Sequence, residues 1–131
     1  MDTTKQPGIA FENVILKELN FSRKSGLLEK PELSVNFSSS SGLSPEKNKL
    51  VFELACEITE KKELFSIKCV MIGMFSRINE QENMDLESFA QNNAAALMFP
   101  YMREIIATTT VRAGIPAIIL PPINVKALIQ K

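Results

Sequence analysis

The chain has 131 residues, of which 45% are hydrophobic, and this fits a single globular domain over residues 1–131 with an ordinary core. Fifteen basic and fifteen acidic residues give a net charge near zero, so the composition offers no electrostatic reason to expect nucleic acid or an anionic membrane as a partner. There is no histidine, which removes the most usual general base and metal ligand.

Alternating apolar side chains predict a long, half-buried strand over residues 9–23. Val14 and Leu16 interrupt this alternation on the other face of the strand. Either a β-bulge shifts the register there, or that face is also covered by a partner strand or a second subunit.

The second predicted strand, residues 32–38, alternates strictly and places Leu33, Val35 and Phe37 on one face. The serine-rich stretch that follows, residues 38–49, has no periodicity and predicts a mobile loop.

Residues 50–59 and 64–78 predict two more strands, joined by a charged turn into an antiparallel hairpin. The second of these strands becomes apolar on both faces from Cys69 to Phe75, a stretch that includes Met71. Such a stretch indicates burial on two sides.

Asp85 can cap a short helix over residues 85–91, and a long helix is predicted over residues 93–112 with Gly114 in its C-terminal cap. The long helix is apolar around most of its circumference and must be covered on two sides. A chain of this length provides one cover, so the pattern predicts that a second copy provides the other.

Residues 115–124 contain three prolines and cannot be regular, yet they are as apolar as a core strand, and a last short helix is predicted over residues 125–130. Together with the long helix, they give the chain more apolar surface than its own core needs. Exposed apolar surface of that extent marks binding of a protein or another apolar partner.

No sequence pattern of a catalytic or metal site is present: there is no nucleophile elbow, phosphate-binding glycine loop or metal-type cysteine spacing. Cys56 and Cys69 are interpreted as small buried hydrophobic residues. We therefore expect no enzyme, no cofactor and no metal. Because there is neither a signal peptide nor an apolar run of about 18 residues, we expect a cytoplasmic protein without membrane insertion.

One pattern near the C-terminal end resembles a known family. The string LMFPYMRE at residues 97–104 is followed, at fixed spacing, by Arg112, Pro116, Leu120, Pro122, Asn124, Ala127 and Leu128. This combination resembles the signature of SecB, the ATP-independent chaperone of bacterial protein export. Weaker similarity extends over the four predicted strands.

The resemblance implies an α+β fold: a four-stranded antiparallel sheet with a long helix, a proline-rich connecting loop and a short C-terminal helix. It also implies dimers formed through the first strand and the long helix, assembled as a homotetramer that is a dimer of dimers. The residues expected at these interfaces are Val14, Leu16, Leu97, Met98, Tyr101 and Ile105.

The resemblance further implies that the proline-rich loop and last helix overhang the sheet and leave a groove for unfolded or precursor polypeptides. The strand face of residues 32–38 could line this groove or could be ordinary core. The residues expected to bind clients are Leu33, Val35, Phe37, Met71, Ile118, Leu120 and Leu128.

Two features depart from the export chaperones, which contact the SecA motor through an acidic patch and an acidic tail. Glu18 matches one acidic position of the patch, but Ser22 and Lys68 stand where two others are expected, and the chain stops at Lys131 without such a tail. Val125 replaces the usual aromatic residue after the final asparagine. We expect binding to SecA to be weak or absent.

The sequence thus indicates a passive chaperone, a holdase that binds non-native polypeptides without nucleotide. Two alternatives stay open: a dedicated chaperone of one client such as an antitoxin, and an oligomeric adaptor without chaperone activity.

Overall fold

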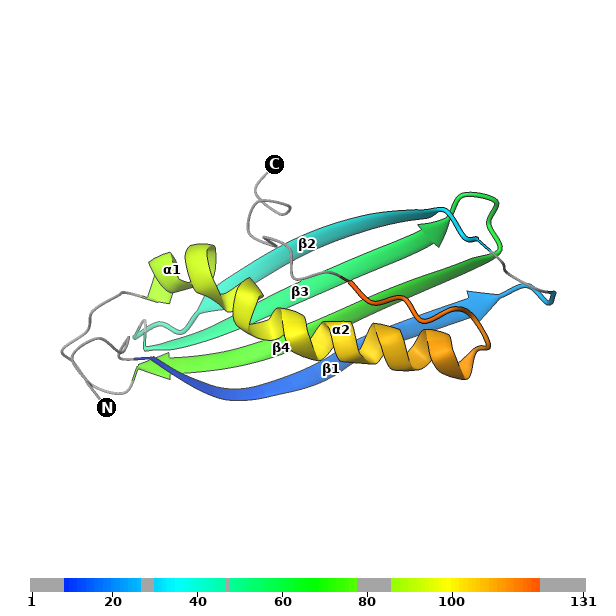
Figure 1. The fold of residues 1–131 in the computed structure, drawn as a ribbon. Coiled ribbons are helices and arrows are strands. Elements are labelled where there is room, and N and C mark those ends of the chain that lie inside the picture. Colours follow the sequence, from blue (N-terminus) through cyan, green and yellow to red (C-terminus); the bar gives the residue numbers. More distant parts are fainter. Residues whose placement is uncertain (1–8, 27–29, 47, 78–85, 121–131) are drawn as a thin grey trace.

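The computed structural model describes residues 9–26, 30–46, 48–77 and 86–120 (Figure 1). Their strands form one sheet in the order β1-β4-β3-β2, and all neighbouring strands are antiparallel. The strands are β1 (Ile9–Arg23), β2 (Leu33–Leu43), β3 (Lys49–Glu60) and β4 (Phe65–Arg77).

The helical part of the chain lies across one face of this sheet (Figure 1). It consists of α1 (Leu86–Phe89), the π-helical turn η2 (Ala90–Ala94) and α2 (Ala95–Arg112). A four-stranded antiparallel sheet with a long helix confirms the predicted α+β fold class. The predicted last helix, residues 125–130, lies outside the described residues.

The predicted loop over residues 38–49 is wrong in its first half, because β2 continues to Leu43 and pairs with β3 from Leu33↔Glu60 to Leu43↔Leu50. The serines at positions 38–41 show no alternation of apolar and polar residues. The sequence pattern therefore stops before the strand ends. The turn closes at Ser44, whose backbone N–H donates to the carbonyl of Lys49 at 2.9 Å.

Two register shifts in β1 confirm a bulged strand, one between Phe11 and Asn13 and the other between Leu16 and Glu18. Each bulge adds one residue and therefore changes which positions face the helix. Val14 and Leu16 face the same side as the buried core of β4, since they pair with Gly73 and Met71.

The core lies between the sheet and α2. On β3, alternate residues from Leu50 to Ile58 are almost completely buried, and on α2 the buried side chains include Met98, Met102 and Ile106. At Gly73 of β4, a Cβ atom would lie 2.7 Å from Met98 Sδ and 3.0 Å from a ring carbon of Phe75. A larger residue here would force Met98 to shift, so glycine lets Met98 pack directly against β4.

Glu60, at the end of β3, is a buried carboxylate that organises the turn into β4. It is 3% exposed and accepts hydrogen bonds from the backbone N–H groups of Lys62 at 2.7 Å, Glu32 at 3.1 Å and Leu64 at 3.3 Å. Burial alone would raise the pKa of Glu60, but these donors outweigh it and hold the pKa below its ordinary value of 4.5. The sequence pattern did not reveal this role.

We expect Glu60→Gln to lower the melting temperature by a few degrees at pH 7 and to flatten the acid limb of the stability profile. A carboxylate with a lowered pKa stabilises the fold above its unfolded pKa, and this contribution is lost as the pH falls through the folded pKa. Thermal unfolding between pH 7 and pH 3 measures both effects. Glu57→Gln, an exposed carboxylate on the same strand, is the matched control; an equal loss there would contradict the assignment.

Candidate functional site

Apolar side chains on the helix-facing side of β2 are exposed to solvent. Leu33 and Val35 are 40% and 37% exposed, although their cross-strand partners on β3, Glu60 and Ile58, are buried. Phe37 is partly buried, with its ring centroid 6.0 Å from that of Phe99 on α2. We call Leu33, Val35 and Phe37 the β2 strip.

Residues 115–120 turn back over the sheet from the end of α2 and run alongside this helix (Figure 1, orange). The turn is a Schellman-type cap, in which Gly114 has φ 73° and Ile115 N–H donates to the carbonyl of Thr110 at 3.0 Å. The buried Thr110 hydroxyl accepts a hydrogen bond from Ile118 N–H at 3.1 Å. Helix α2 therefore fixes the position of the returning segment.

Several residues predicted to bind clients lie instead in the core. Met71, Ile118 and Leu120 are 3%, 7% and 5% exposed and belong to the buried core cluster. They present no open surface in this chain, and Leu128 lies outside the described residues. Of the predicted set, the β2 strip is the part that is accessible.

A second open apolar surface lies on the opposite flank of α2. Leu97 and Tyr101 on α2 are 44% and 45% exposed, Leu16 on β1 is 45% exposed, and Val14 and Ile105 are partly buried. Tyr101 lies over β1, since it lines one shallow pocket with Val14. We call Val14, Leu16, Leu97, Tyr101 and Ile105 the β1 flank.

Met98 does not belong to this surface, although the sequence placed it there. It is fully buried and points at Gly73, because the row that faces the sheet is Ala95, Met98, Phe99, Met102 and Ile106. Leu19 of β1, 38% exposed and on the same side as Leu16, was not predicted. The face to which Leu19 points depends on both bulges, and simple alternation along the sequence does not indicate where they lie.

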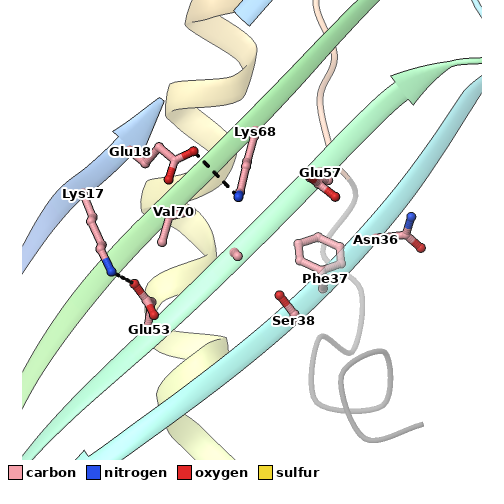
Figure 2. Close-up of a pocket in the computed structure, with 10 residues that line it drawn as sticks. Lys17, Glu18, Asn36, Phe37, Ser38, Glu53, Glu57, Lys68 and Val70 are labelled. Atoms are coloured by element: carbon pink, nitrogen blue, oxygen red, sulfur yellow. Dashed lines mark hydrogen bonds and ion pairs between the residues drawn. The ribbon is translucent and has the colours of Figure 1, made fainter. Parts of the chain in front are cut away.

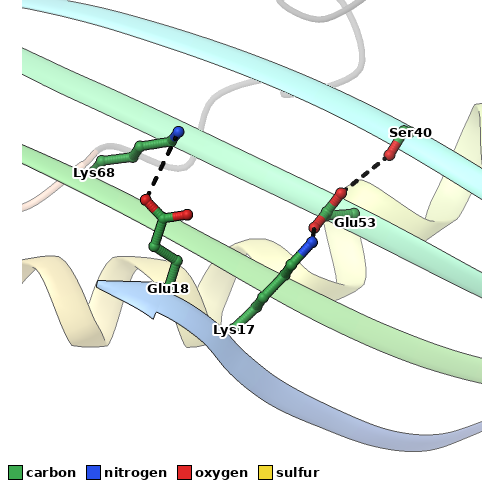
Figure 3. A network of polar contacts seen from close by, with 5 residues as sticks. All are labelled: Lys17, Glu18, Ser40, Glu53 and Lys68. Carbon is green, nitrogen blue, oxygen red and sulfur yellow. Dashed lines mark hydrogen bonds and ion pairs between the residues drawn. The ribbon is translucent and has the colours of Figure 1, made fainter. Parts of the chain in front are cut away.

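The other face of the sheet carries a shallow depression of about 430 Å³ lined mainly by charged and polar side chains (Figure 2). Lys17 Nζ lies 2.6 Å from Glu53 Oε1, and Ser40 Oγ donates to the other oxygen of Glu53 at 3.3 Å (Figure 3). The hydrogen bond between Lys17 and Glu53 raises the pKa of Lys17 and lowers the pKa of Glu53.

Glu18, the predicted motor-binding residue, is engaged in the same network. Lys68 Nζ lies 3.7 Å from its carboxylate, and Asn20 Nδ2 donates to the same oxygen at 2.6 Å. This face therefore carries two lysine–carboxylate pairs, at Glu18 and Glu53, together with the exposed Glu57. Lys68 thus opposes the acidic character expected at Glu18.

The possible metal ligands and the two cysteines among the described residues also bear on the chemistry. Within them, no three His, Cys, Asp or Glu side chains gather as metal ligands. Cys56 and Cys69 are direct cross-strand partners, and burial raises their pKa values to about 12 and about 11. Both thiols are thus neutral and buried at physiological pH.

In the part of the chain that the structure covers, no helix has both the length and the apolar character needed to cross a membrane.

The family model described as preprotein translocase subunit SecB matches residues 2–131. The chain belongs to the SecB family. This confirms the resemblance read from the signature, and it places the β2 strip, the β1 flank and the paired charges on a SecB-type fold.

Relatives and a solved structure agree with this assignment. An uncharacterized protein of Methanocaldococcus jannaschii is 31% identical over 98% of this chain and 86% of its own length. The protein-export protein SecB of Anaplasma phagocytophilum is 28% identical over 96% of this chain and 93% of its own. The Mycobacterium tuberculosis Rv1957 SecB-like chaperone, solved with a ChAD peptide from the Rv1956 HigA1 antitoxin, shares the fold with a TM-score of 0.74 at 15% identity, covering 88% of each chain.

We propose that the β1 flank joins two copies of the chain, as the first step of a homotetramer. Tyr101→Asp should then shift the protein to smaller species in sedimentation at micromolar concentration, because a charge would have to be buried between subunits. Val51→Asp is the control, since Val51 is 47% exposed on the other face of the sheet. A wild-type protein that sediments as a monomer would refute the proposal.

Proposed function

We propose that this SecB-family protein is an ATP-independent holdase that binds non-native polypeptides at the β2 strip. The observation that carries the proposal is the exposure of Leu33 and Val35 beside a completely buried row on β3. A strand face this apolar is normally covered, so its exposure favours binding of an apolar partner.

The mechanism is passive and depends on several weak contacts. Burying one large apolar client side chain contributes roughly 1.5–3 kcal/mol, which ordering costs largely offset. An assembly offers several copies of the strip to one client chain, and such avidity raises the apparent affinity by roughly 100-fold or more. A folded client exposes no extended apolar segment and is released.

A dedicated chaperone of one client is the second candidate, and one observation favours it. The Rv1957 chaperone, which shares this fold, was solved with a peptide from an antitoxin. An adaptor without chaperone activity is the third. Suppression of aggregation of several unrelated unfolded proteins separates them: broad protection supports the holdase, protection of one client supports the dedicated form, and none supports the adaptor.

The ion pairs Lys17–Glu53 and Lys68–Glu18 are relevant to a separate question, whether clients are delivered to SecA. Lys68 lies against the carboxylate of Glu18, so the acidic position that matches the exporting relatives is neutralised by its neighbour. We propose that any contact with SecA is weaker than in those relatives, because attraction between an acidic patch and a basic surface raises the association rate and sets orientation.

The double variant Leu33→Ser with Val35→Ser should weaken protection of an unfolded client by about tenfold or more in concentration, since two of the few apolar contacts are lost. Stability against urea should fall less than client protection, because more than a third of each residue is already exposed to water. Equal losses of stability and protection would show that the strip is core.

Val51→Ser is the matched control for this pair. It removes a similarly exposed β-branched residue from the opposite face of the sheet, so client protection should be unchanged. A loss of protection in Val51→Ser as large as in the double variant would contradict binding at the β2 strip.

Lys68→Glu should strengthen binding to purified SecA at low salt by about two- to fivefold, the effect of an exposed charge contact worth about 0.5–1 kcal/mol. Arg112→Glu, which makes the same change of net charge at an exposed position of α2 on the opposite face of the sheet, is the control. Submicromolar binding by the wild-type protein, weakened by Glu18→Lys, would refute the proposal and favour the export pathway.

A further inference from the structure

The two edges of the sheet differ in a way that nothing else in the fold requires. The β1 edge is interrupted by two bulges, and the two residues left out of register there are Glu12 and Lys17, both charged. The β2 edge has no bulge: all 11 of its residues pair in unbroken register with β3. None of these 11 residues is charged or proline.

Proteins protect exposed sheet edges with bulges, charged side chains or proline, because an open edge is a template for another strand. β1 carries the first two of these devices and β2 carries none. Within the described ranges, no further backbone segment hydrogen-bonds to the outer edge of β2. In a regular antiparallel strand, every second residue points its N–H and C=O groups away from its partner. This edge therefore offers a row of free donors and acceptors.

We propose that the outer edge of β2 takes up an extended segment of the client polypeptide as an added strand of the sheet. The inference rests on the proposed holdase function and specifies how the client binds. Main-chain hydrogen bonds supply affinity that is independent of the client's sequence, as in other cases of strand addition. Binding through main-chain hydrogen bonds accounts for an edge that has regular pairing but no charged residue and no proline.

The side chains of β2 set which segments fit. On one face, an added strand would lie beside Leu33, Val35 and Phe37, and on the other beside Ser34 and Asn36. A segment that alternates apolar and polar residues matches both faces. Residues 38–42 are serines and one glycine, and a Cβ atom at Gly42 would meet nothing within 4 Å, so this half of the edge presents only small side chains to an added strand.

The first test is hydrogen exchange followed by NMR. The probe is a synthetic peptide of alternating valine and threonine, as long as β2 and with a lysine at each end. Binding should slow the exchange of every second amide of β2 by about tenfold or more, because only the outward amides gain a partner. Peptide binding that leaves β2 exchange unchanged would overturn the proposal while the holdase function stands.

The second test removes the donors of the probe. The same peptide N-methylated at every residue between the lysines keeps its side chains but donates no backbone hydrogen bond. It should bind at least about tenfold more weakly in fluorescence anisotropy, and equal binding of the two peptides would overturn the proposal.

Two neighbouring proline variants test the protein side. At Ser38 and Ser39, one N–H bonds to β3 and the other points outward, and proline is tolerated on an edge strand where the N–H faces outward. Urea unfolding identifies the tolerated variant, which should bind the peptide more weakly. Unchanged binding by that variant would count against strand addition, and if neither variant folds, the exchange and methylation results decide.

Two further outcomes can be distinguished: occupation of the edge by a second copy of the chain, and failure of the holdase function itself. If alternate β2 amides are already protected without peptide, and more so at higher protein concentration, a second copy occupies the edge and the proposal is wrong. If the peptide does not bind and unfolded proteins are not protected from aggregation, the proposal fails together with the holdase function.

Discussion

The packing of α2 onto β4 at Gly73 determines which surfaces of the sheet remain open. Met98 sits where any larger residue at Gly73 would place its Cβ atom, so the helix lies directly against the middle of the sheet. A helix about 10 Å across cannot cover four strands spaced about 4.8 Å apart. The core therefore forms under α2, and apolar side chains on both flanks are left without cover from this helix. The β1 flank and the β2 strip are two consequences of one contact.

The β1 flank and the β2 side are built from different elements, and this difference favours different partners. On the β1 side, the helix itself contributes Leu97 and Tyr101, so a copy of the chain would meet a rigid surface of helix and strand together. On the β2 side, strand residues stay partly exposed next to an edge that has no bulge and no charged residue. A surface built from helix and strand together favours a fixed subunit contact, whereas a strand edge with few specific side chains favours varied extended segments.

Most of the fold could be predicted from periodicity, and the failures have physical causes. β1, β3 and β4 were placed within one or two residues because their apolar alternation records burial on one face. The second half of β2 was missed because Ser38–Leu43 is held by main-chain pairing, which leaves no trace in side-chain pattern. Met98 was assigned to the wrong face because a helix apolar on two sides does not indicate which row meets the sheet. Glu60 was missed because a carboxylate satisfied by backbone donors looks like any charged turn residue.

The arrangement also separates the surface that we propose for clients from the charged face of the sheet. The β2 strip and the edge of β2 lie on the helix side and rim of the sheet, whereas the ion pairs of Lys17 and Lys68 lie on the opposite face. A charge change on that face alters no apolar contact of the strip, since side chains of neighbouring strand residues point to opposite sides. The charges on which our proposal about SecA depends can therefore change without altering the surface that we propose for non-native polypeptides.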